Sequence, residues 1–399
     1  MSVTEHTFAA TRSQLTAALA RLGDAPVVGV DVERADAHQY WRRPALIQLG
    51  CGGTVVLVDP LAVDDLAALH AFLDDRTVVL HAMENDIAPL QSVGVHPPRI
   101  EDTAVAAAVL GLPTGLETLL DTLLGVSYDG DKASMQRADW SQRPLTDDMV
   151  AYAAYDVADL PRLWDTLETR LGETGRCAWY RQERDAVRAL PPIEERRSWT
   201  RLRGLGRLDR RAQTRARALW LARETLARDT DTAPNRIVSD RTLLGLAAEP
   251  VADARSLRIR GMRRQAVRRF GAQLVAALRD GQDDALVPAR ARRLDEQDRE
   301  AVNRLRAERS RIADREGVDP GVLCPNRSLE HAVSTRAETL DDLRAALDLR
   351  PWQWQLMADA FTDVLQLPAP QPNASASDGR EGSPTPEPTD SSGGTRHHG

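Results

Sequence analysis

The chain has 399 residues, of which 42% are hydrophobic and 28% are charged, and its net charge is −7. This length predicts two or three domains, and the composition excludes both a small disulfide-stapled scaffold and a wholly disordered chain. The three cysteines lie far apart and form no C-x-x-C pair, so we expect neither a disulfide framework nor a cysteine zinc site. Because there is no secretory signal pattern and no apolar run long enough to span a bilayer, we expect a cytoplasmic protein without a membrane role.

The charge is unevenly distributed along the chain. Residues 194–290 contain 22 arginines, no lysine and 12 acidic residues, which gives this segment a net charge of +10 and leaves −17 for the remainder. Lys132 is the only lysine of the chain, so the abundance of arginine alone carries little information. The net positive charge of the segment is informative, because a basic region attracts the phosphates of a nucleic acid whatever the base sequence.

Strand-like and helix-like runs alternate between residues 25 and 172. Runs rich in β-branched residues predict strands over 26–33, 45–51, 54–60 and 77–83. Apolar residues at helical spacing predict helices over 64–73, 102–110, 116–124 and 146–171, the last of them starting at Thr146 as its N-cap. The pair Gly52 and Gly53 predicts a hairpin between two of the strands. This pattern indicates an α/β domain with a mixed sheet and helices on its faces.

Strand signals vanish after about residue 206. Helical patterns follow over 207–228, 240–247, 256–259 and 263–278, and a second all-helical unit runs from 294 to 365. The remaining C-terminal residues are rich in Pro, Ser, Thr and Gly, and they cannot bury a core. We therefore predict an α/β domain over 1–190, two all-α domains over 206–284 and 294–365, and a disordered tail over 366–399.

Acidic residues mark the predicted α/β domain at three places. Asp31 and Glu33 are two residues apart on a strand of valines, so both carboxylates face the same side; a charged face on an edge strand is the alternative. Asp86 follows the strand that contains VVLHAM, where it could instead be a helix N-cap. Tyr152 and Asp156 are four residues apart on one helix face among alanines, and a tyrosine there could simply belong to the core.

Together these residues resemble the DEDD superfamily of 3′-5′ exonucleases in its tyrosine subtype, and within it the bacterial ribonuclease D family. The segments GVDVERADAHQYWRRPALIQLG, VVLHAMENDIAPL and AYAAYDVADLPRLW resemble its three motifs, in the same order and at similar spacing. EDTAVAAAVLG and the stretch from Lys132 to Pro144 are also similar to this family. One departure is Asn85, where relatives often carry an acid. Since Tyr152 stands where the other subtype has histidine, that subtype is excluded.

The resemblance implies a ribonuclease H-like exonuclease domain and a two-metal mechanism. Asp31, Glu33, Asp86 and Asp156 would bind two divalent ions, Mg²⁺ or Mn²⁺, because these ions prefer hard oxygen ligands. Asp31 would bridge both ions, Glu33 and Asp156 would serve the ion that activates water, and Asp86 would help to hold the other. Tyr152 would orient the attacking water, since a phenol is too weak a base to accept its proton at neutral pH. The product would be a nucleoside 5′-monophosphate released from a 3′ end.

Substrate contacts are less well defined by the sequence. His81, Lys132, Gln136 and Arg143 could contact phosphate or the terminal ribose, although His81 could be a hydrogen-bonded strand-end residue and Arg143 could pair with an acid. The segments RALWLARETLARDTDTAPNRIVSDRTLLGLA and SLRIRGMRRQAVRRFGAQLVAAL resemble the HRDC domain, which is shared by RecQ-type helicases and ribonuclease D. Its densest basic cluster is Arg258, Arg260, Arg263, Arg264, Arg268 and Arg269. We expect Arg263 and Arg264 to guide RNA electrostatically, without base readout.

The favoured function is that of a metal-dependent 3′-5′ exoribonuclease acting on single-stranded or structured RNA 3′ ends, such as tRNA precursors. A DNA exonuclease of the same superfamily is one alternative, because the sequence does not show how a 2′-hydroxyl would be read. A catalytically inactive RNA-binding scaffold is the other, and the presence of all four acids and Tyr152 argues against it. The sequence indicates no protein partner.

Overall fold

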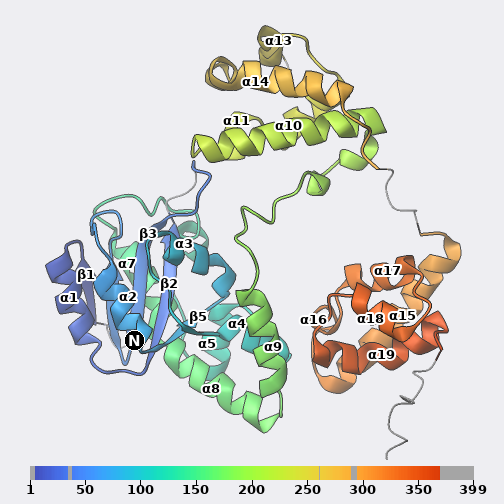
Figure 1. The fold of residues 1–399 in the computed structure, drawn as a ribbon. Coiled ribbons are helices and arrows are strands. Elements are labelled where there is room, and N and C mark those ends of the chain that lie inside the picture. Colours follow the sequence, from blue (N-terminus) through green and yellow to red (C-terminus); the bar gives the residue numbers. More distant parts are fainter. Residues whose placement is uncertain (1–4, 35–37, 260, 289–293, 369–399) are drawn as a thin grey trace, which may run out of the picture.

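The computed structural model describes residues 5–34, 38–259, 261–288 and 294–368, and the predicted disorder of the tail beyond 368 lies outside these residues. An α/β unit is followed by two separate helical units (Figure 1). The strands of the α/β unit are β1 (Glu5–Ala9), β2 (Val27–Arg34), β3 (Pro44–Cys51), β4 (Thr54–Val58), β5 (Thr77–Leu80) and β6 (Arg99–Asp102). Its helices are α1 (Arg12–Arg21), α2 (Ala67–Asp74), α3 (Ile87–Ser92), α4 (Thr103–Val109), α5 (Leu116–Leu124), α6 (Lys132–Met135), α7 (Asp147–Ala158), α8 (Leu160–Glu173) and α9 (Cys177–Arg188).

The strands form one mixed sheet in the order β1-β4-β3-β2-β5-β6. β2 pairs with β3 antiparallel and with β5 parallel, which confirms the mixed sheet expected from the sequence. The predicted hairpin joins β3 to β4, where Cys51 pairs with Thr54. Gly52 and Gly53 between them have φ angles of 57° and 84°, the left-handed values that a two-residue hairpin turn requires.

Each face of the sheet is covered by its own set of helices. Val28, Val30 and Val32 of β2 point into the core formed with α1 and α2. The opposite face carries the core formed with α4, α5, α7 and α8. Because side chains alternate along a strand, Asp31 and Glu33 must face this second set of helices.

The helix predicted over 146–171 is in fact two helices. α7 begins at the predicted cap, where the Thr146 side chain accepts a hydrogen bond from the Met149 amide at 3.2 Å. It ends at Ala158, and α8 starts at Leu160 with Pro161 in its first turn. Proline has no amide hydrogen and its ring collides with the carbonyl four residues earlier, so the chain bends at Asp159 although the apolar spacing continues.

Both helical units have cores of their own. The first contains α10 (Arg210–Asp229), α11 (Pro234–Ile237), α12 (Asp240–Ala248), α13 (Ala254–Ile259) and α14 (Arg264–Asp283). The second contains α15 (Glu296–Glu316), α16 (Pro320–Leu323), α17 (Asn326–Thr335), α18 (Leu340–Ala346) and α19 (Pro351–Leu365). Trp352 and Trp354 are 2% and 9% exposed, which confirms that they are core residues.

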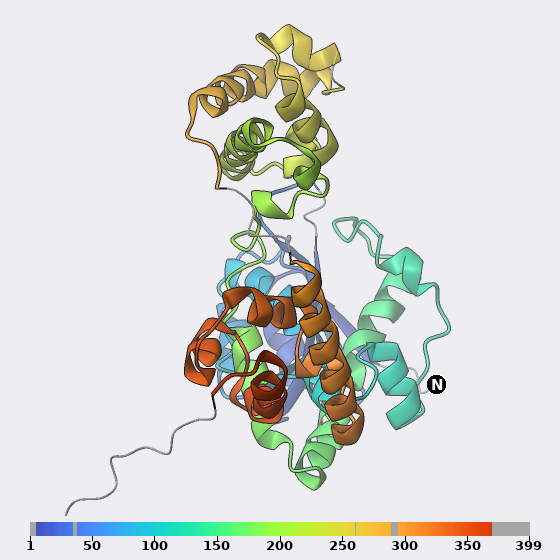
Figure 2. The same ribbon diagram turned by 90° about the vertical axis from the view of Figure 1, so that its right-hand side faces the viewer.

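The second helical unit packs against α9, which the sequence analysis did not predict (Figure 2). The rings of Trp179 on α9 and Trp352 on α19 stack with their centroids 4.6 Å apart. The indole nitrogen of Trp352 also donates a hydrogen bond to Glu183 at 2.9 Å. These contacts fix the unit to the α/β unit near α4, where Arg176 donates to the carbonyl oxygens of Val109 and Glu316.

Candidate active site

The two carboxylates of β2 lie inside the sheet rather than on an edge. β2 is flanked by β3 and β5, so the alternative of a charged edge strand does not apply to Asp31 and Glu33. Asp31 pairs with Gln48 and Glu33 pairs with Leu46, and a bulge follows between Glu33 and Arg34. The strand therefore holds both carboxylates on the face that α7 covers.

Close packing of α7 brings Asp156 to these carboxylates. The carbonyl oxygen of Val157, at the bend between α7 and α8, lies directly over Gly29 of β2 and Gly50 of β3. A Cβ atom placed on Gly29 would be 2.6 Å from this oxygen, and one on Gly50 would be 2.4 Å from it. Glycine at both positions therefore lets the helix approach the sheet closely enough for Asp156 to reach β2.

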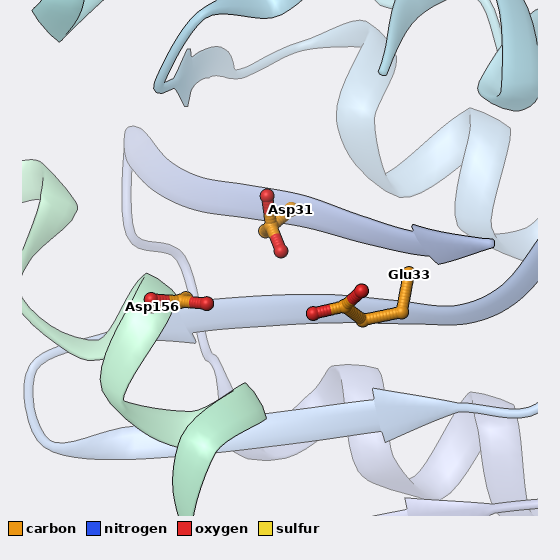
Figure 3. Close-up of side chains that lie close together, drawn as sticks. All are labelled: Asp31, Glu33 and Asp156. Atoms are coloured by element: carbon orange, nitrogen blue, oxygen red, sulfur yellow. The ribbon is translucent and has the colours of Figure 1, made fainter. Parts of the chain in front are cut away.

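Asp31, Glu33 and Asp156 converge into one cluster (Figure 3), with a carboxylate oxygen of each within 4.8 Å of those of the others. Burial raises the pKa of Asp31 to about 6. Burial, together with repulsion from Asp31 and Asp156, raises the pKa of Glu33 to about 9, and burial with repulsion from Asp31 raises that of Asp156 to about 8. Burial is the largest cause of each upward shift, so the cluster keeps three carboxylates away from water, and an oxygen-only donor set of this kind suits a hard divalent cation.

Asp86 lies beside this cluster on another element. It precedes α3, but its side chain makes no capping hydrogen bond. The side chain of Asp86 therefore does not cap the helix, which was the alternative interpretation. It is only 4% exposed, and burial followed by repulsion from Asp31 raises its pKa well above the ordinary value. Asp86 is not part of the three-residue cluster itself, but the negative charges of Asp31 and Glu33 both raise its pKa.

Tyr152 lies one turn before Asp156 on α7 and is 5% exposed. Burial and the negative charge of Asp156, to which its hydroxyl is hydrogen-bonded, raise the pKa of the phenol above its ordinary value of 10.0. Its ring packs edge-on against Tyr128, with the centroids 5.6 Å apart. Tyr152 is therefore a core residue as well as a neighbour of the carboxylates, and its hydroxyl keeps its proton at neutral pH.

Comparison with known proteins identifies the family. A 3′-5′ exonuclease family model matches residues 7–172, and the HRDC domain model matches residues 212–278 and 298–365. Ribonuclease D of Granulibacter bethesdensis is 34% identical over 344 residues, which make up 82% of this chain and 86% of that protein. The chain belongs to the ribonuclease D family. It is a 3′-5′ exoribonuclease, as the sequence predicted, and the scaffold interpretation is not retained.

Solved structures agree with the fold expected for a ribonuclease D. The crystal structure of Escherichia coli RNase D, an exoribonuclease involved in structured RNA processing, has a TM-score of 0.74 and 24% identity, covering 91% of this chain and 99% of that one. The catalytic core of RRP6 from Trypanosoma brucei has a TM-score of 0.61 and 25% identity, covering 72% and 82% of the two chains. The predicted exonuclease domain followed by helical HRDC domains is confirmed.

His81 and Lys132 lie near the carboxylates of this ribonuclease D. The Nδ1 atom of His81 is 2.9 Å from the hydroxyl of Thr103, so the ring is hydrogen-bonded as the structural alternative supposed. Burial, helped by the positive charge of Lys132, lowers the pKa of His81 to about 4, so the imidazole is neutral at neutral pH. The Lys132 ammonium lies 3.6 Å from Glu117, and Gln136 is exposed at the end of α6.

The predicted arginines lie outside the carboxylate cluster. Arg143 donates to both carboxylate oxygens of Asp59, at 2.6 and 2.8 Å, and to the carbonyl oxygen of Ala45. Arg143 therefore pairs with an acid, which was the alternative to a substrate contact. Arg263 and Arg264 are exposed at the start of α14. This helix is on the side of the first HRDC domain that faces away from the α/β unit (Figures 1 and 2), so the structure does not bring them to the carboxylates.

Two residues of the site were missed by sequence reasoning. Asp102 is fully buried and accepts hydrogen bonds from the amides of Ala82, Met83, Ala104 and Val105, which fixes the turn between β5 and Asp86. Its position as an acid just before a helix was the available signal. Arg34 directly follows Glu33, and its charge lowers the pKa of Glu33 and of Asp86 against their net upward shifts.

The part of the chain that the structure describes contains no helix that is both long and apolar enough to cross a membrane.

Proposed function

We propose that Asp31, Glu33, Asp86 and Asp156 hold two divalent ions, Mg²⁺ or Mn²⁺, and that these ions support hydrolysis of the terminal phosphodiester of RNA. The observation that carries the proposal is the convergence of three carboxylates within 4.8 Å, with the fourth buried beside them. Such ions would supply a nucleophilic hydroxide and neutralise charge on the reacting phosphate.

The protein's own residues have separate tasks in this proposal. Asp31 occupies the centre of the site, since its charge acts on Glu33, on Asp156 and on Asp86, and it would contact both ions. Glu33 and Asp156 would serve the side from which water attacks. Tyr152 keeps its proton and stands beside Asp156, so it would orient the water by hydrogen bonding rather than remove its proton.

We further propose that the substrates are RNA 3′ ends with a structured body, such as tRNA precursors, and that nucleoside 5′-monophosphates are released in the cytoplasm. The E. coli relative is described as an exoribonuclease involved in structured RNA processing, which supports this choice. His81, Lys132 and Gln136 would contact the terminal nucleotide, and Arg263 and Arg264 would attract the RNA body. We also propose that the exonuclease domain spans residues 1–190 and that the two HRDC domains span 206–284 and 294–365.

The experiment uses the purified protein with 5′-labelled single-stranded RNA and DNA of the same sequence. Each substrate is incubated with Mg²⁺, with Mn²⁺ and with EDTA, beside the Asp31→Asn and Asp156→Asn variants. We expect a ladder that shortens from the 3′ end of the RNA, requires a divalent ion and is lost in both variants. Full activity of either variant would contradict the assignment of the carboxylates, and faster degradation of DNA than of RNA would contradict the substrate.

A further inference from the structure

Gln48 lies within β3, next to the carboxylates, and its side chain is completely buried. β3 is flanked by β2 and β4, and Gln48 pairs with Asp31 on one side and with Leu57 on the other. Because directly paired residues of antiparallel strands point to the same face of a sheet, Gln48 shares with Asp31 the face that α7 covers. The Gln48 amide is therefore an internal neighbour of the candidate metal site.

Neither polar atom of this amide has a hydrogen-bond partner among the described residues. The nitrogen and the oxygen of Gln48 are both buried, so bulk water does not reach them either. Burial of an unpaired amide opposes folding, and for this reason protein interiors contain few of them. The side chain of Gln48 therefore lowers the stability of the sheet as long as it has no partner.

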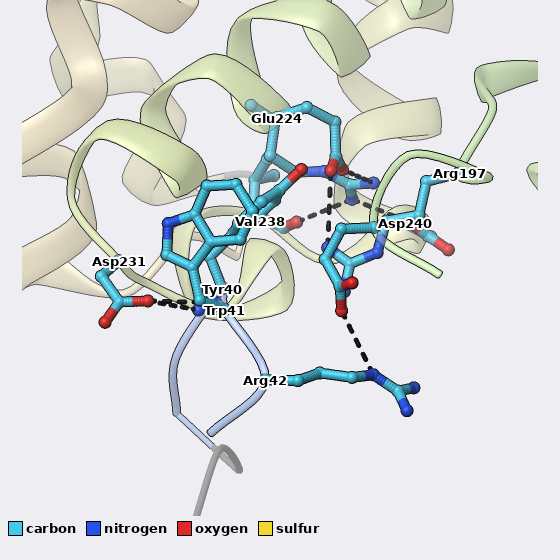
Figure 4. A network of polar contacts seen from close by, with 10 residues as sticks. Tyr40, Trp41, Arg42, Arg197, Glu224, Asp231, Val238 and Asp240 are labelled. Atoms are coloured by element: carbon cyan, nitrogen blue, oxygen red, sulfur yellow. Dashed lines mark hydrogen bonds and ion pairs between the residues drawn. The ribbon is translucent and has the colours of Figure 1, made fainter. Parts of the chain in front are cut away.

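Charged side chains that are buried elsewhere in the chain do have partners. On α10, Arg223 donates to the carboxylate of Asp240 at 2.6 Å. Its neighbour Glu224 pairs with Arg197 at 3.5 Å, in the polar network of Figure 4. Several arginines have one nitrogen without an acceptor, but each of them is hydrogen-bonded through another atom. Among the described residues, only Gln48 has two buried polar atoms that both lack a partner.

The sheet offers one polar neighbour to this amide. The residues that flank Gln48 on its face of the sheet are Leu46 and Gly50 along β3, and Asp31 and Leu57 across from it. Of these four, only Asp31 has a polar side chain. The Cβ atoms of such a cross-strand pair are about 4.5–5.5 Å apart, a separation that the long side chain of glutamine can span. The Asp31 carboxylate is therefore the natural acceptor for the amide nitrogen.

A hydrogen bond from an amide would suit a carboxylate that binds cations. Carboxylates that bind metal ions are themselves held by hydrogen bonds, which fix their orientation. Removal of a carboxylate from water disfavours its charged form, and a hydrogen bond to that form offsets part of this effect. An amide is a neutral donor. It can hold Asp31 without the repulsion that a lysine or an arginine would exert on an incoming cation.

We propose that Gln48 is a positioning residue of the metal site, whose amide nitrogen donates a hydrogen bond to the Asp31 carboxylate when that carboxylate binds a divalent ion. Gln48 would act through Asp31 and not on RNA, since its side chain has no exposed surface. This inference rests on the proposed metal-dependent function and adds a residue to it. The amide would then weaken the fold in the absence of metal and stabilise the protein once metal is bound.

The test uses the full chain with Gln48→Met, which keeps the length of the side chain and removes the amide. We expect the melting temperature in EDTA to rise by roughly 2–4 °C, because an unpaired amide is no longer buried. Mn²⁺ binding is measured without RNA, by calorimetry and by the rise in melting temperature. The variant should need about ten- to a hundredfold more Mn²⁺ than the wild type for half-maximal binding.

Gln353→Met is the matched control, because Gln353 is also a buried glutamine but both of its polar atoms have partners. Its oxygen accepts a hydrogen bond from the Arg350 amide, and its nitrogen donates to the carbonyl oxygen of Val322, both at 2.7 Å. This variant should melt at a lower temperature than the wild type in EDTA, because it leaves a donor and an acceptor unpaired. It should bind Mn²⁺ as the wild type does, since Gln353 lies on α19 of the second HRDC domain.

Either of two results for Gln48→Met would overturn the proposal. A melting temperature in EDTA below that of the wild type, or failure to fold, would mean that the amide already has partners in the absence of metal. An unchanged affinity for Mn²⁺ would mean that the amide does not act on Asp31. A wild type that binds no Mn²⁺ would instead overturn the proposed metal-dependent function, so the two failures are distinguishable.

Discussion

The carbonyl oxygen of Val157 lies so close to Gly50 that a Cβ atom there would be 2.4 Å from it. This contact joins the bend between α7 and α8 to the centre of the sheet. The preceding residue of α7 is Asp156, which completes the carboxylate cluster with Asp31 and Glu33. The distance between a helix bend and a glycine therefore sets the geometry of the candidate metal site.

Gly50→Ala should displace α7 from the sheet. Overpacking against a backbone atom typically costs about 1–3 kcal/mol, so we expect a lower melting temperature. Because Asp156 would move with the helix, activity should fall more than the loss of folded protein explains, and higher divalent-ion concentration should restore part of it. Melting curves and metal titrations of activity measure both effects.

Gly172→Ala is the control for this substitution. Gly172 lies in α8, and nothing lies within 4 Å of the position of its missing Cβ. Alanine is the better helix former by roughly 0.5–1 kcal/mol, so this variant should be at least as stable as the wild type and equally active. Equal behaviour of the two glycine variants would show that the close approach at Gly50 does not matter.

Local sequence patterns were sufficient to predict which carboxylates share one face of their element. Asp31 with Glu33, and Tyr152 with Asp156, are pairs within single elements, so the period of the strand or helix already puts each pair on one face. The hairpin at Gly52 and the two helical units were predictable for the same reason, because turn chemistry and helical periodicity are local signals.

Features that depend on distant contacts were not predictable. β1 and β6 are short strands that pair parallel with β4 and β5, and their sequences carry little periodicity of their own. The bend at Asp159 was concealed by continuous apolar spacing, although Pro161 was a visible signal. The cleft lined by Arg34, Arg201 and Trp220 brings together residues that are far apart in the chain, so no window of sequence contains it.

Tyr152→Phe should separate catalysis from folding. The ring is buried against Tyr128, and phenylalanine keeps that packing while removing only the hydroxyl beside Asp156. We expect kcat to fall about 100-fold, with KM and melting temperature nearly unchanged, because the loss of a positioned group acts on the transition state. Steady-state kinetics on labelled RNA provide the measurement. A variant with wild-type kcat would limit Tyr152 to a structural role.

Asp102→Asn should loosen the turn that carries Asp86. The carboxylate accepts from four amides, and an asparagine has only one oxygen with which to replace two. Leaving buried donors without an acceptor costs on the order of 2 kcal/mol, and we expect a comparable loss in the free energy of unfolding together with weaker activity. Asp319→Asn is the control, since Asp319 caps the exposed start of α16 through two amides, and asparagine is an equally good cap. Urea unfolding of the two variants compares them directly.

Replacement of both Arg263 and Arg264 by alanine tests the electrostatic guidance of RNA. Both side chains are exposed on α14, and this helix lies on the side of the first HRDC domain that faces away from β2 (Figure 1), so kcat should be unchanged. Binding of long RNA should weaken, and the slope of its salt dependence should decrease by about 0.7 for each phosphate contact that is lost. Filter binding at several salt concentrations measures the slope. Unchanged binding would show that neither arginine takes part in RNA recognition.

The carboxylate cluster predicts an unusual pH dependence of stability in the absence of metal. The pKa values of Asp31, Asp156 and Glu33 are raised to about 6, 8 and 9 in the folded protein, from 3.8, 3.8 and 4.5. At a pH between the ordinary and the raised pKa of each carboxyl group, the folded protein retains a proton that the unfolded chain releases. The free energy of unfolding must therefore decrease as the pH rises from about 4 to 9, because stability falls with pH wherever the unfolded state binds fewer protons.

Divalent ions should reverse this loss, because they bind the ionised carboxylates of the folded protein and stabilise it by mass action. We expect the melting temperature in EDTA to fall from pH 5 to about pH 9, and added Mn²⁺ to raise it most at the alkaline end. Asp31→Asn removes one charge from the cluster, so its melting temperature in EDTA should depend less on pH and respond less to Mn²⁺. If the wild type and this variant had parallel pH profiles in EDTA, the raised pKa of Asp31 would not be contributing to the pH dependence of stability.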